Sequence, residues 1–245
     1  MKKKISSNAL EETIAAYTFL TPNLLGFMIF TLIPVLASLV LSFLEWDLLS
    51  PPRFVGFANF ISLFQDPYFW KYCSNTVYMM ICIPLSMAGS LILALAMNQK
   101  LKGILFFRTV YFLPTLCSGV AIYMLWRLIY NPEFGVLNMA ISKFGEIIGL
   151  SLKGPQWLTD EAWAKPALII MGVWQAVGGY NMILYLAALQ GVPRDLYDAA
   201  EVDGANPWQK FWAVTWPQIS PTTFFIAIMS IIGGFQAGFD PAYIM

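Results

Sequence analysis

Five long stretches of this sequence contain no charged side chain, and this segregation of charge strongly limits what the chain can fold into. The stretches contain 32, 28, 18, 28 and 29 residues, and a helix needs roughly 20 apolar residues to cross a bilayer. Charged residues make up 11% of the chain, against about 25% in soluble domains, so a polar outer shell cannot be built. We therefore predict an all-α polytopic membrane protein with five spans, at about 17–43, 73–98, 107–130, 166–190 and 220–240.

The distribution of charge indicates which side of the membrane each connection faces. Short cytoplasmic loops collect lysine and arginine. The basic residues of the N-terminus and of the link after the second span are Lys2, Lys3, Lys4, Lys100, Lys102 and Arg108. The connections at 44–72 and 131–165 contain more acids than bases. Their acids are Glu45, Asp47, Asp66, Glu133, Glu146, Asp160 and Glu161. We predict a cytoplasmic N-terminal segment at 1–16, a transmembrane domain over 17–245, and a cytoplasmic segment at 191–219.

The chain lacks the residues that most enzymes and ion-coupled carriers use. It contains no histidine and none of the phosphate-binding, zinc-protease or nucleophile-elbow motifs. Acidic pairs that could hold a metal or relay protons are absent from the predicted spans, and the zero net charge argues against a basic surface for nucleic acid. We therefore predict no catalytic residue, no metal site and no cofactor, and any pathway should recognise a neutral or weakly polar solute.

The fourth predicted span contains side chains that suit such a solute. Its amides and aromatic rings lie close together in sequence, at Trp174, Gln175, Tyr180, Asn181 and Tyr185. A sugar offers hydroxyl groups at its rim and C–H patches on its face, which amides and aromatic rings bind together. Interhelical hydrogen bonding by Gln175 and Asn181 is the alternative interpretation.

A charged segment at 198–217 interrupts the apolar sequence and predicts a helix–turn–helix in water. Its acids are Asp198, Glu201 and Asp203. Gly204 can adopt the left-handed conformation that ends a helix, and Asn206-Pro207 is typical of the start of the next one. The bulky face of this second helix is predicted to be buried, and Pro217 is predicted to end it. That face consists of Trp208, Phe211, Trp212 and Thr215. A helix pair that lies passively on the bilayer is the alternative.

The order of residues in this segment resembles the loop that marks the permease subunits of binding-protein-dependent ABC importers. The matching positions are Asp198-Ala199-Ala200, Gly204 and Val214-Thr215-Trp216-Pro217. Asp198 stands where the family usually has glutamate, and Trp216 stands where leucine is common. Shorter similarities to the carbohydrate-uptake (maltose/glycerol-3-phosphate-like) branch occur in order along nearly the whole chain, at Ser42-Phe43 to Trp46, Phe54-Val55-Gly56, Phe107-Arg108 to Pro114, Asn131-Pro132 and Phe134-Gly135.

The resemblance implies a subunit that forms a pathway in a prokaryotic inner membrane and binds no ATP itself. Its partners would be ABC ATPase subunits, a second permease subunit in a heterodimer, and an extracytoplasmic solute-binding protein. The ATPase-docking loop would contain Asp198, Ala199, Ala200, Glu201, Asp203, Gly204 and Pro217. The expected solute is a sugar or a related polyol or glycerol phosphate.

Two other functions compete with this expectation, and one feature departs from the family. The chain could serve an ABC importer for a different solute class, or it could be a membrane-embedded enzyme or scaffold that uses the loop for assembly only. Members of this branch usually contain a sixth span, whereas this sequence stops at Met245. We therefore expect the sixth span to be missing.

Overall fold

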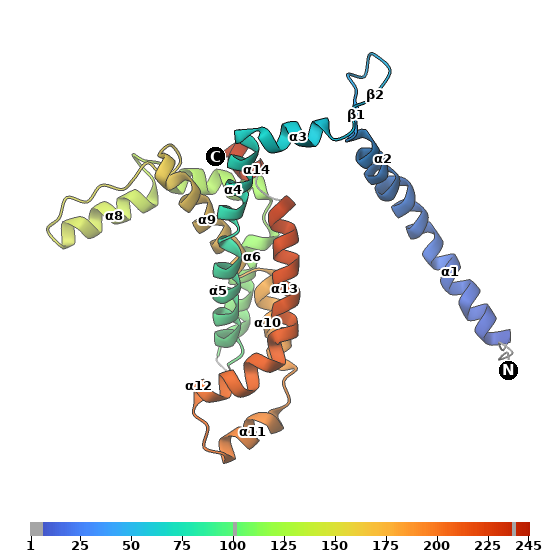
Figure 1. The fold of residues 1–245 in the computed structure, drawn as a ribbon. Helices are drawn as coiled ribbons and strands as arrows, with labels where there is room; N and C mark the ends of the chain where they lie inside the picture. Colours follow the sequence, from blue (N-terminus) through green and yellow to red (C-terminus); the bar gives the residue numbers. More distant parts are fainter. Residues whose placement is uncertain (1–6, 100–101, 237–238) are drawn as a thin grey trace. The chain divides into compact units, whose positions relative to one another are not determined.

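The computed structural model describes residues 7–99, 102–236 and 239–245 (Figure 1). The chain divides into two compact units, Met1–Tyr72 and Cys73–Met245.

The first unit begins with a long apolar helix. It consists of α1 (Ser7–Phe27), the π-helical turn η1 (Met28–Leu32) and α2 (Ile33–Leu41). None of the side chains described over 11–41 is buried within the chain. Intramolecular packing therefore does not explain this helix, and its apolar surface is suited to contact with lipid or with another membrane helix.

A short β-hairpin follows the helix and was not predicted. Strands β1 (Leu44–Glu45) and β2 (Arg53–Phe54) are antiparallel, and α3 (Ala58–Gln65) and α4 (Pro67–Met79) come next. The Asn59 side chain donates hydrogen bonds of 3.0 Å to the carbonyls of both Ser42 and Leu44. Because these bonds tie α3 to the base of the hairpin, the first predicted outer connection has a defined structure.

The second unit is a bundle of helices with an extension at each end. Figure 1 shows α5, α6, α10 and α13 side by side, with α11 and α12 beyond one end and α8 and α14 near the other. Its elements are α5 (Cys82–Met97), α6 (Ile104–Leu116), α7 (Gly119–Ile129), α8 (Val136–Ile147), α9 (Glu161–Val177), α10 (Tyr180–Gln190), α11 (Arg194–Val202), α12 (Pro207–Lys210), the π-helical turn η2 (Phe211–Thr215), α13 (Trp216–Gln236) and α14 (Phe239–Ile244).

Small residues allow α5 and α9 to pack closely. A methyl group added at Gly89 would lie 2.7 Å from Val177 Cγ2, and one added at Gly172 would lie 3.0 Å from Cys82 Sγ. Ser90 is fully buried and its hydroxyl donates to the Ala176 carbonyl at 3.3 Å. Helices in a bilayer associate through such close contacts, because lipid is as apolar as the side chains.

Two apolar clusters lie at opposite ends of this bundle. The cluster beside α11 contains Leu91, Ala94, Met97, Met182, Tyr185, Leu186, Leu189, Val192, Ile219 and Ile226. The cluster beside α8 contains Ile122, Trp126, Tyr130, Trp157, Ala167 and Met171. The segments 131–165 and 191–219 extend from these opposite ends (Figure 1).

Each of the five predicted spans overlaps a helix or helix pair of suitable length and composition. Three helices are long and apolar enough to cross a membrane, at Glu11–Leu41, Pro67–Met97 and Pro207–Gln236. Two further candidates are bent pairs, α6 with α7 at 100° and α9 with α10 at 40°. The sequence therefore located the apolar segments but not the position of the break between α6 and α7.

The break between α6 and α7 has a local cause. Cys117 and Ser118 are extended, with ψ values of 147° and 144°, and the Ser118 hydroxyl accepts a hydrogen bond from the Ala121 N–H at 3.4 Å. A serine at this position begins a new helix. Pro114 lies three residues before Cys117, in the last turn of α6.

Both π-helical turns end two residues before a proline. The Ile33 N–H bonds to the Met28 carbonyl before Pro34, and the Trp216 N–H bonds to the Phe211 carbonyl before Pro217. A proline ring clashes with the carbonyl four residues earlier and offers no N–H. A π turn contains one extra residue, so it gives the ring room and lets the helix continue.

The predicted outer connection 131–165 folds around the buried side chain of Asn138. Its amide nitrogen donates to the carbonyls of Pro132 and Pro155, at 3.1 and 3.3 Å. Its amide oxygen accepts from Trp157 Nε1 at 2.7 Å. One side chain therefore joins α8 to the segment that leads into α9.

Replacing Asn138 with leucine should destabilise this connection by about 2 to 4 kcal/mol, because a buried N–H and two carbonyls lose their partner. The expected result is a lower midpoint in thermal unfolding of the purified protein in detergent. Thr159→Val is the matched control, since it removes an exposed hydrogen bond to Gln156 from the same connection. Equal midpoints for the two variants would contradict the role of Asn138.

Candidate functional site

The segment 191–219, which we call the coupling loop after the family resemblance described above, contains α11, a turn and the first part of the helix Pro207–Gln236. Gly204 has a φ of +76°, the Ala205 N–H bonds to the Ala200 carbonyl, and the Gly204 N–H bonds to the Glu201 carbonyl. These two bonds satisfy the last carbonyls of α11 in the manner that a left-handed glycine permits. The sequence therefore determines where α11 ends.

The second helix of the loop begins with a reciprocal cap. The Gln209 N–H donates to the Asn206 side chain at 2.9 Å, and the Asn206 N–H donates to the Gln209 side chain at 2.8 Å. Pro207 occupies the first turn, where its missing N–H has no helical partner. The turn between the two helices is thus defined on both sides.

Two side-chain contacts connect the helices of the coupling loop. Lys210 Nζ lies 2.8 Å from Glu201 Oε2, and the hydroxyls of Tyr197 and Thr215 are hydrogen-bonded at 2.9 Å. The hydrogen bond from Lys210, followed by its positive charge, lowers the pKa of Glu201. The ion pair is therefore present at neutral pH and is lost as the pH falls through the lowered pKa of Glu201.

The predicted docking residues leave α11 with an open surface. Asp198, Ala199, Glu201, Asp203 and Gly204 are exposed, and Ala200 is half-buried. None of the residues of α11 is buried. The acids and alanines are therefore available to a partner along most of this helix.

Two expectations for the second half of the loop are wrong. Pro217 is exposed but does not end a helix, because the π turn η2 accommodates it and Pro207–Gln236 is one long helix. The bulky face is not buried either, since Trp208 is 69% and Trp212 is 48% exposed. Only Thr215 of that face is buried. Trp208 and Trp212 pack on each other, with ring centroids 5.7 Å apart, whereas Phe211 of the same face packs against the cluster beside α11.

The predicted pathway residues lie on both sides of the break between α9 and α10. Trp174 and Gln175 precede Gly178-Gly179, and Tyr180 and Asn181 follow it. Trp174 and Tyr180 are 43% and 65% exposed. The fifth predicted residue, Tyr185, is 1% exposed and belongs to the cluster beside α11, so its ring packs between helices.

The glycines at this break permit close contact with α6. A methyl group on Gly178 would overlap the Tyr111 carbonyl oxygen, and one on Gly179 would lie 2.9 Å from Thr115 Oγ1. The Tyr180 ring also contacts Phe112, with a centroid distance of 5.6 Å. The broken fourth span therefore rests directly on the first half of the broken third.

Several polar groups near the break have no partner among the residues that the structure describes. Thr115 Oγ1 and Trp126 Nε1 are buried without a hydrogen bond, and the Trp126 ring contacts Trp174 at 5.5 Å. Within the same described part, the amides of Gln175 and Asn181 form no hydrogen bond to another helix. The hydroxyl and the indole N–H are therefore enclosed, whereas Gln175 and Asn181 are half-buried.

Sequence reasoning did not find Thr115, Trp126 or Tyr197, and it placed Thr215 only on the bulky face of the loop's second helix and in the family motif. Thr115 and Trp126 lie in the predicted third span, and their proximity to the fourth depends on tertiary packing. Tyr197 lies before the acids of the coupling loop and Thr215 lies after them. Their hydroxyl groups meet only because the chain turns back between them. No sequence motif marks a hydroxyl group that will lie next to a glycine pair or in a π turn of the folded chain.

An apolar helical bundle with a capped, exposed acidic helix–turn–helix at one end defines a membrane permease that a partner can contact from the aqueous side. Residues 86–244 match the family model described as binding-protein-dependent transport system inner membrane component. The chain belongs to this family of inner membrane transport components.

Its relatives and structural neighbours agree with this assignment. The probable ABC transporter permease protein YurN of Bacillus subtilis is 38% identical over 96% of this chain and 80% of the relative. The lactose transport system permease protein LacF of Rhizobium radiobacter is 38% identical over 94% of this chain and 75% of the relative. A bacterial alginate ABC transporter, solved in complex with its alginate pentasaccharide-bound periplasmic protein, matches 98% of this chain and 82% of its own with a TM-score of 0.78 and 25% identity.

Replacing Gly178 with alanine should destabilise the bundle by about 1 to 3 kcal/mol, because the added methyl group meets a backbone carbonyl that cannot turn away. The expected result is a lower thermal unfolding midpoint in detergent. Gly233→Ala is the matched control, since a methyl group at that position in α13 meets nothing within 4 Å. A Gly178→Ala midpoint at or above that of the control would contradict the close contact with α6.

Proposed function

We propose that this chain is a permease subunit of an ATP-driven ABC importer and forms the membrane pathway for a sugar or a related polyol or glycerol phosphate. The observation that supports this proposal most strongly is the exposed coupling loop at one end of the bundle, in a chain that belongs to this family. The solute class is supported by relatives that are named for lactose and for arabinooligosaccharides. A neighbour that is an importer of the acidic polysaccharide alginate supports it further.

The proposed assembly contains two ATPase subunits, a second permease subunit and a solute-binding protein. The neighbouring importer was solved with a periplasmic binding protein, which supports delivery of the solute from outside. In this proposal an ATPase cleft receives α11 with its acids and alanines, and the second permease subunit completes the pathway. Nucleotide-driven closure of the ATPases then displaces the coupling loop and the helices attached to it. Two states that the partner contacts differently are what such coupling requires.

We also propose that the N-terminus and the coupling loop are cytoplasmic. Lys102 and Arg108 lie near the coupling loop, because Met97 and Ile104 belong to the apolar cluster beside α11 and Arg108 donates to the Met97 carbonyl. Short connections rich in basic residues remain on the cytoplasmic side. The acidic connection 131–165 leaves the other end of the bundle and would face the binding protein.

The pathway is proposed to pass the break between α9 and α10. Trp174, Gln175, Tyr180 and Asn181 would line it, with Tyr185 packed behind them. The support is the set of exposed rings and unpaired amides on both sides of a glycine-mediated break. Discontinuous helices near the middle of a membrane are a common way to expose polar groups to a solute.

Replacing Asp198 with lysine should uncouple solute uptake from ATP hydrolysis, because the charge that α11 offers to the ATPase is reversed. Uptake of radiolabelled lactose, an arabinooligosaccharide or glycerol 3-phosphate by the complete complex in proteoliposomes would be measured with phosphate release. Asp195→Lys is the matched control, since it makes the same charge change on the same exposed helix. Unchanged coupling in the Asp198 variant would overturn the docking assignment.

Replacing Gly204 with valine should disrupt the same coupling through the backbone. The φ of +76° costs a residue with a side chain about 1 to 2 kcal/mol, and a β-branched residue resists it most. Gly204→Asn is the matched control, because asparagine tolerates this conformation. We expect reduced uptake per ATP for valine and near-normal uptake for asparagine, and the reverse order would contradict the role of the turn.

Replacing Trp174 and Asn181 with alanine should weaken uptake of a sugar without releasing the ATPase. Each change removes a ring or an amide that we propose contacts the solute, so the apparent KM for uptake should rise about tenfold, the equivalent of about 1.4 kcal/mol. Phe224→Ala on the exposed face of α13 is the control for loss of an aromatic ring elsewhere. Normal affinity and rate in the double variant would remove both residues from the pathway.

A further inference from the structure

The attachment of α11 to the rest of the chain depends on few side chains. Tyr197 is the residue of α11 that packs against the apolar cluster at this end of the bundle. In the described part of the chain, the polar contacts from α11 to the helix Pro207–Gln236 are the Tyr197–Thr215 hydrogen bond and the Glu201–Lys210 ion pair. A displacement of α11 can therefore reach that helix through the turn or through these two contacts.

The two contacts differ in their surroundings. The Glu201 side chain is 75% exposed, so water and salt screen its ion pair and it contributes little. Thr215 is 5% exposed and Tyr197 is half-buried, so their hydrogen bond is partly shielded from water. Losing one partner of a buried hydrogen bond leaves the other unsatisfied. The Tyr197–Thr215 bond is therefore the stronger of the two connections.

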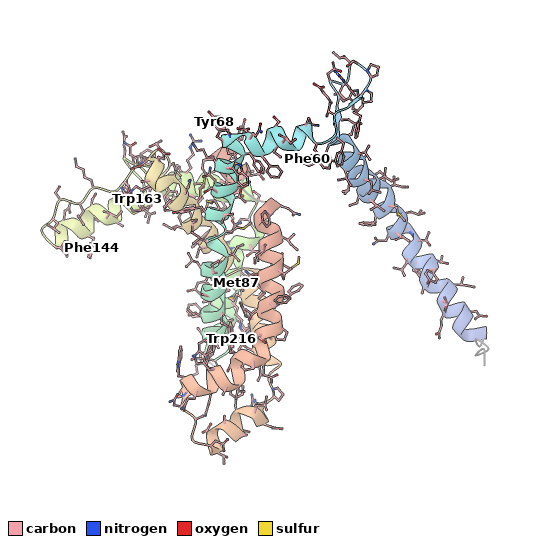
Figure 2. The ribbon with its side chains drawn as sticks, viewed as in Figure 1. Phe60, Tyr68, Met87, Phe144, Trp163 and Trp216 are labelled. Atoms are coloured by element: carbon pink, nitrogen blue, oxygen red, sulfur yellow. The ribbon has the colours of Figure 1, made fainter. Side chains whose placement is uncertain are left out.

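Thr215 also lies where the long helix is most able to bend. It is the last residue of the π turn η2, and Pro217, two residues later, provides no N–H to the helical hydrogen-bond ladder. Helices bend at π turns and prolines more readily than elsewhere. Figure 2 shows Trp216 at this position, where the helix passes from the loop into the bundle.

We propose that the Tyr197–Thr215 hydrogen bond is the positioning contact that transmits the movement of α11 to α13, and that the π turn before Pro217 is the joint at which α13 responds. This inference rests on the proposed function, since it requires an ATPase that moves α11. Neither residue is among those proposed to contact the solute or the ATPase.

The test uses four variants of the chain in the complete complex: Tyr197→Phe, Thr215→Val, Thr215→Ser and the double variant Tyr197→Phe/Thr215→Val. The first two remove the hydrogen bond with little change in volume, and Thr215→Ser keeps the hydroxyl. We expect uptake of the test sugar per ATP hydrolysed to fall about three- to tenfold in Tyr197→Phe and Thr215→Val, the range that corresponds to one buried hydrogen bond. Thr215→Ser should keep the normal uptake per ATP hydrolysed. The double variant should show the same loss of coupling as either single variant. Copurification of the ATPase should persist throughout.

The outcomes separate this inference from the function on which it rests. If Thr215→Val couples as well as Thr215→Ser while Asp198→Lys uncouples, the transmission contact is overturned and the importer assignment stands. Additive losses in the double variant would show that the two hydroxyls do not act as a pair, which also overturns the inference. If Asp198→Lys couples normally, the proposed docking itself fails. Should Thr215→Val not assemble, Tyr197→Phe alone decides, because full coupling in that variant contradicts the proposal.

Discussion

The lack of water in a bilayer governs this structure, because every backbone N–H and carbonyl at that depth needs a partner from the protein. Long uninterrupted helices meet the requirement by themselves. A break does so only where other parts of the chain cover it, and the α9–α10 break lies directly against the backbone of α6 at Tyr111. The glycines at 178 and 179 are therefore required by packing, since a side chain would hold the two segments apart.

The sequence predicted the class of fold and the turn inside the coupling loop because both depend on local chemistry. Uncharged segments of sufficient length mark helices in lipid, and Gly204 and Asn206 act on their own neighbours. The break at Cys117-Ser118 was missed because a serine cap in an apolar run resembles an ordinary packing residue. The continuation of the helix through Pro217 was missed because a π turn is a property of the folded helix and leaves no composition signal.

The candidate pathway was only partly visible in the sequence for a similar reason. Trp174, Gln175, Tyr180 and Asn181 lie close together along the chain, so their grouping can be read directly. Their neighbours Thr115 and Trp126 come from another helix pair, and packing alone brings them there. Tyr185 belongs to the same stretch of sequence, but the turn of α10 directs it into the core. Proximity in sequence identified the region of the candidate pathway, and helix geometry decided which of its side chains are exposed.

The π turn before Pro217 fixes how the coupling loop is rotated about the helix that follows. One extra residue in a turn rotates everything on one side of it by about 100° relative to a regular α-helix. In the present register Lys210, before the turn, faces Glu201, while Thr215, Ile219 and Ile226, at its end and after it, are buried. Regular α-helical bonding through the same residues would rotate these two groups relative to each other, whereas deletion of one residue between Phe211 and Thr215 would restore regular bonding and keep them aligned. For the exchange of coupling loops between permeases, the number of residues between the asparagine cap and the proline thus matters as much as their identity.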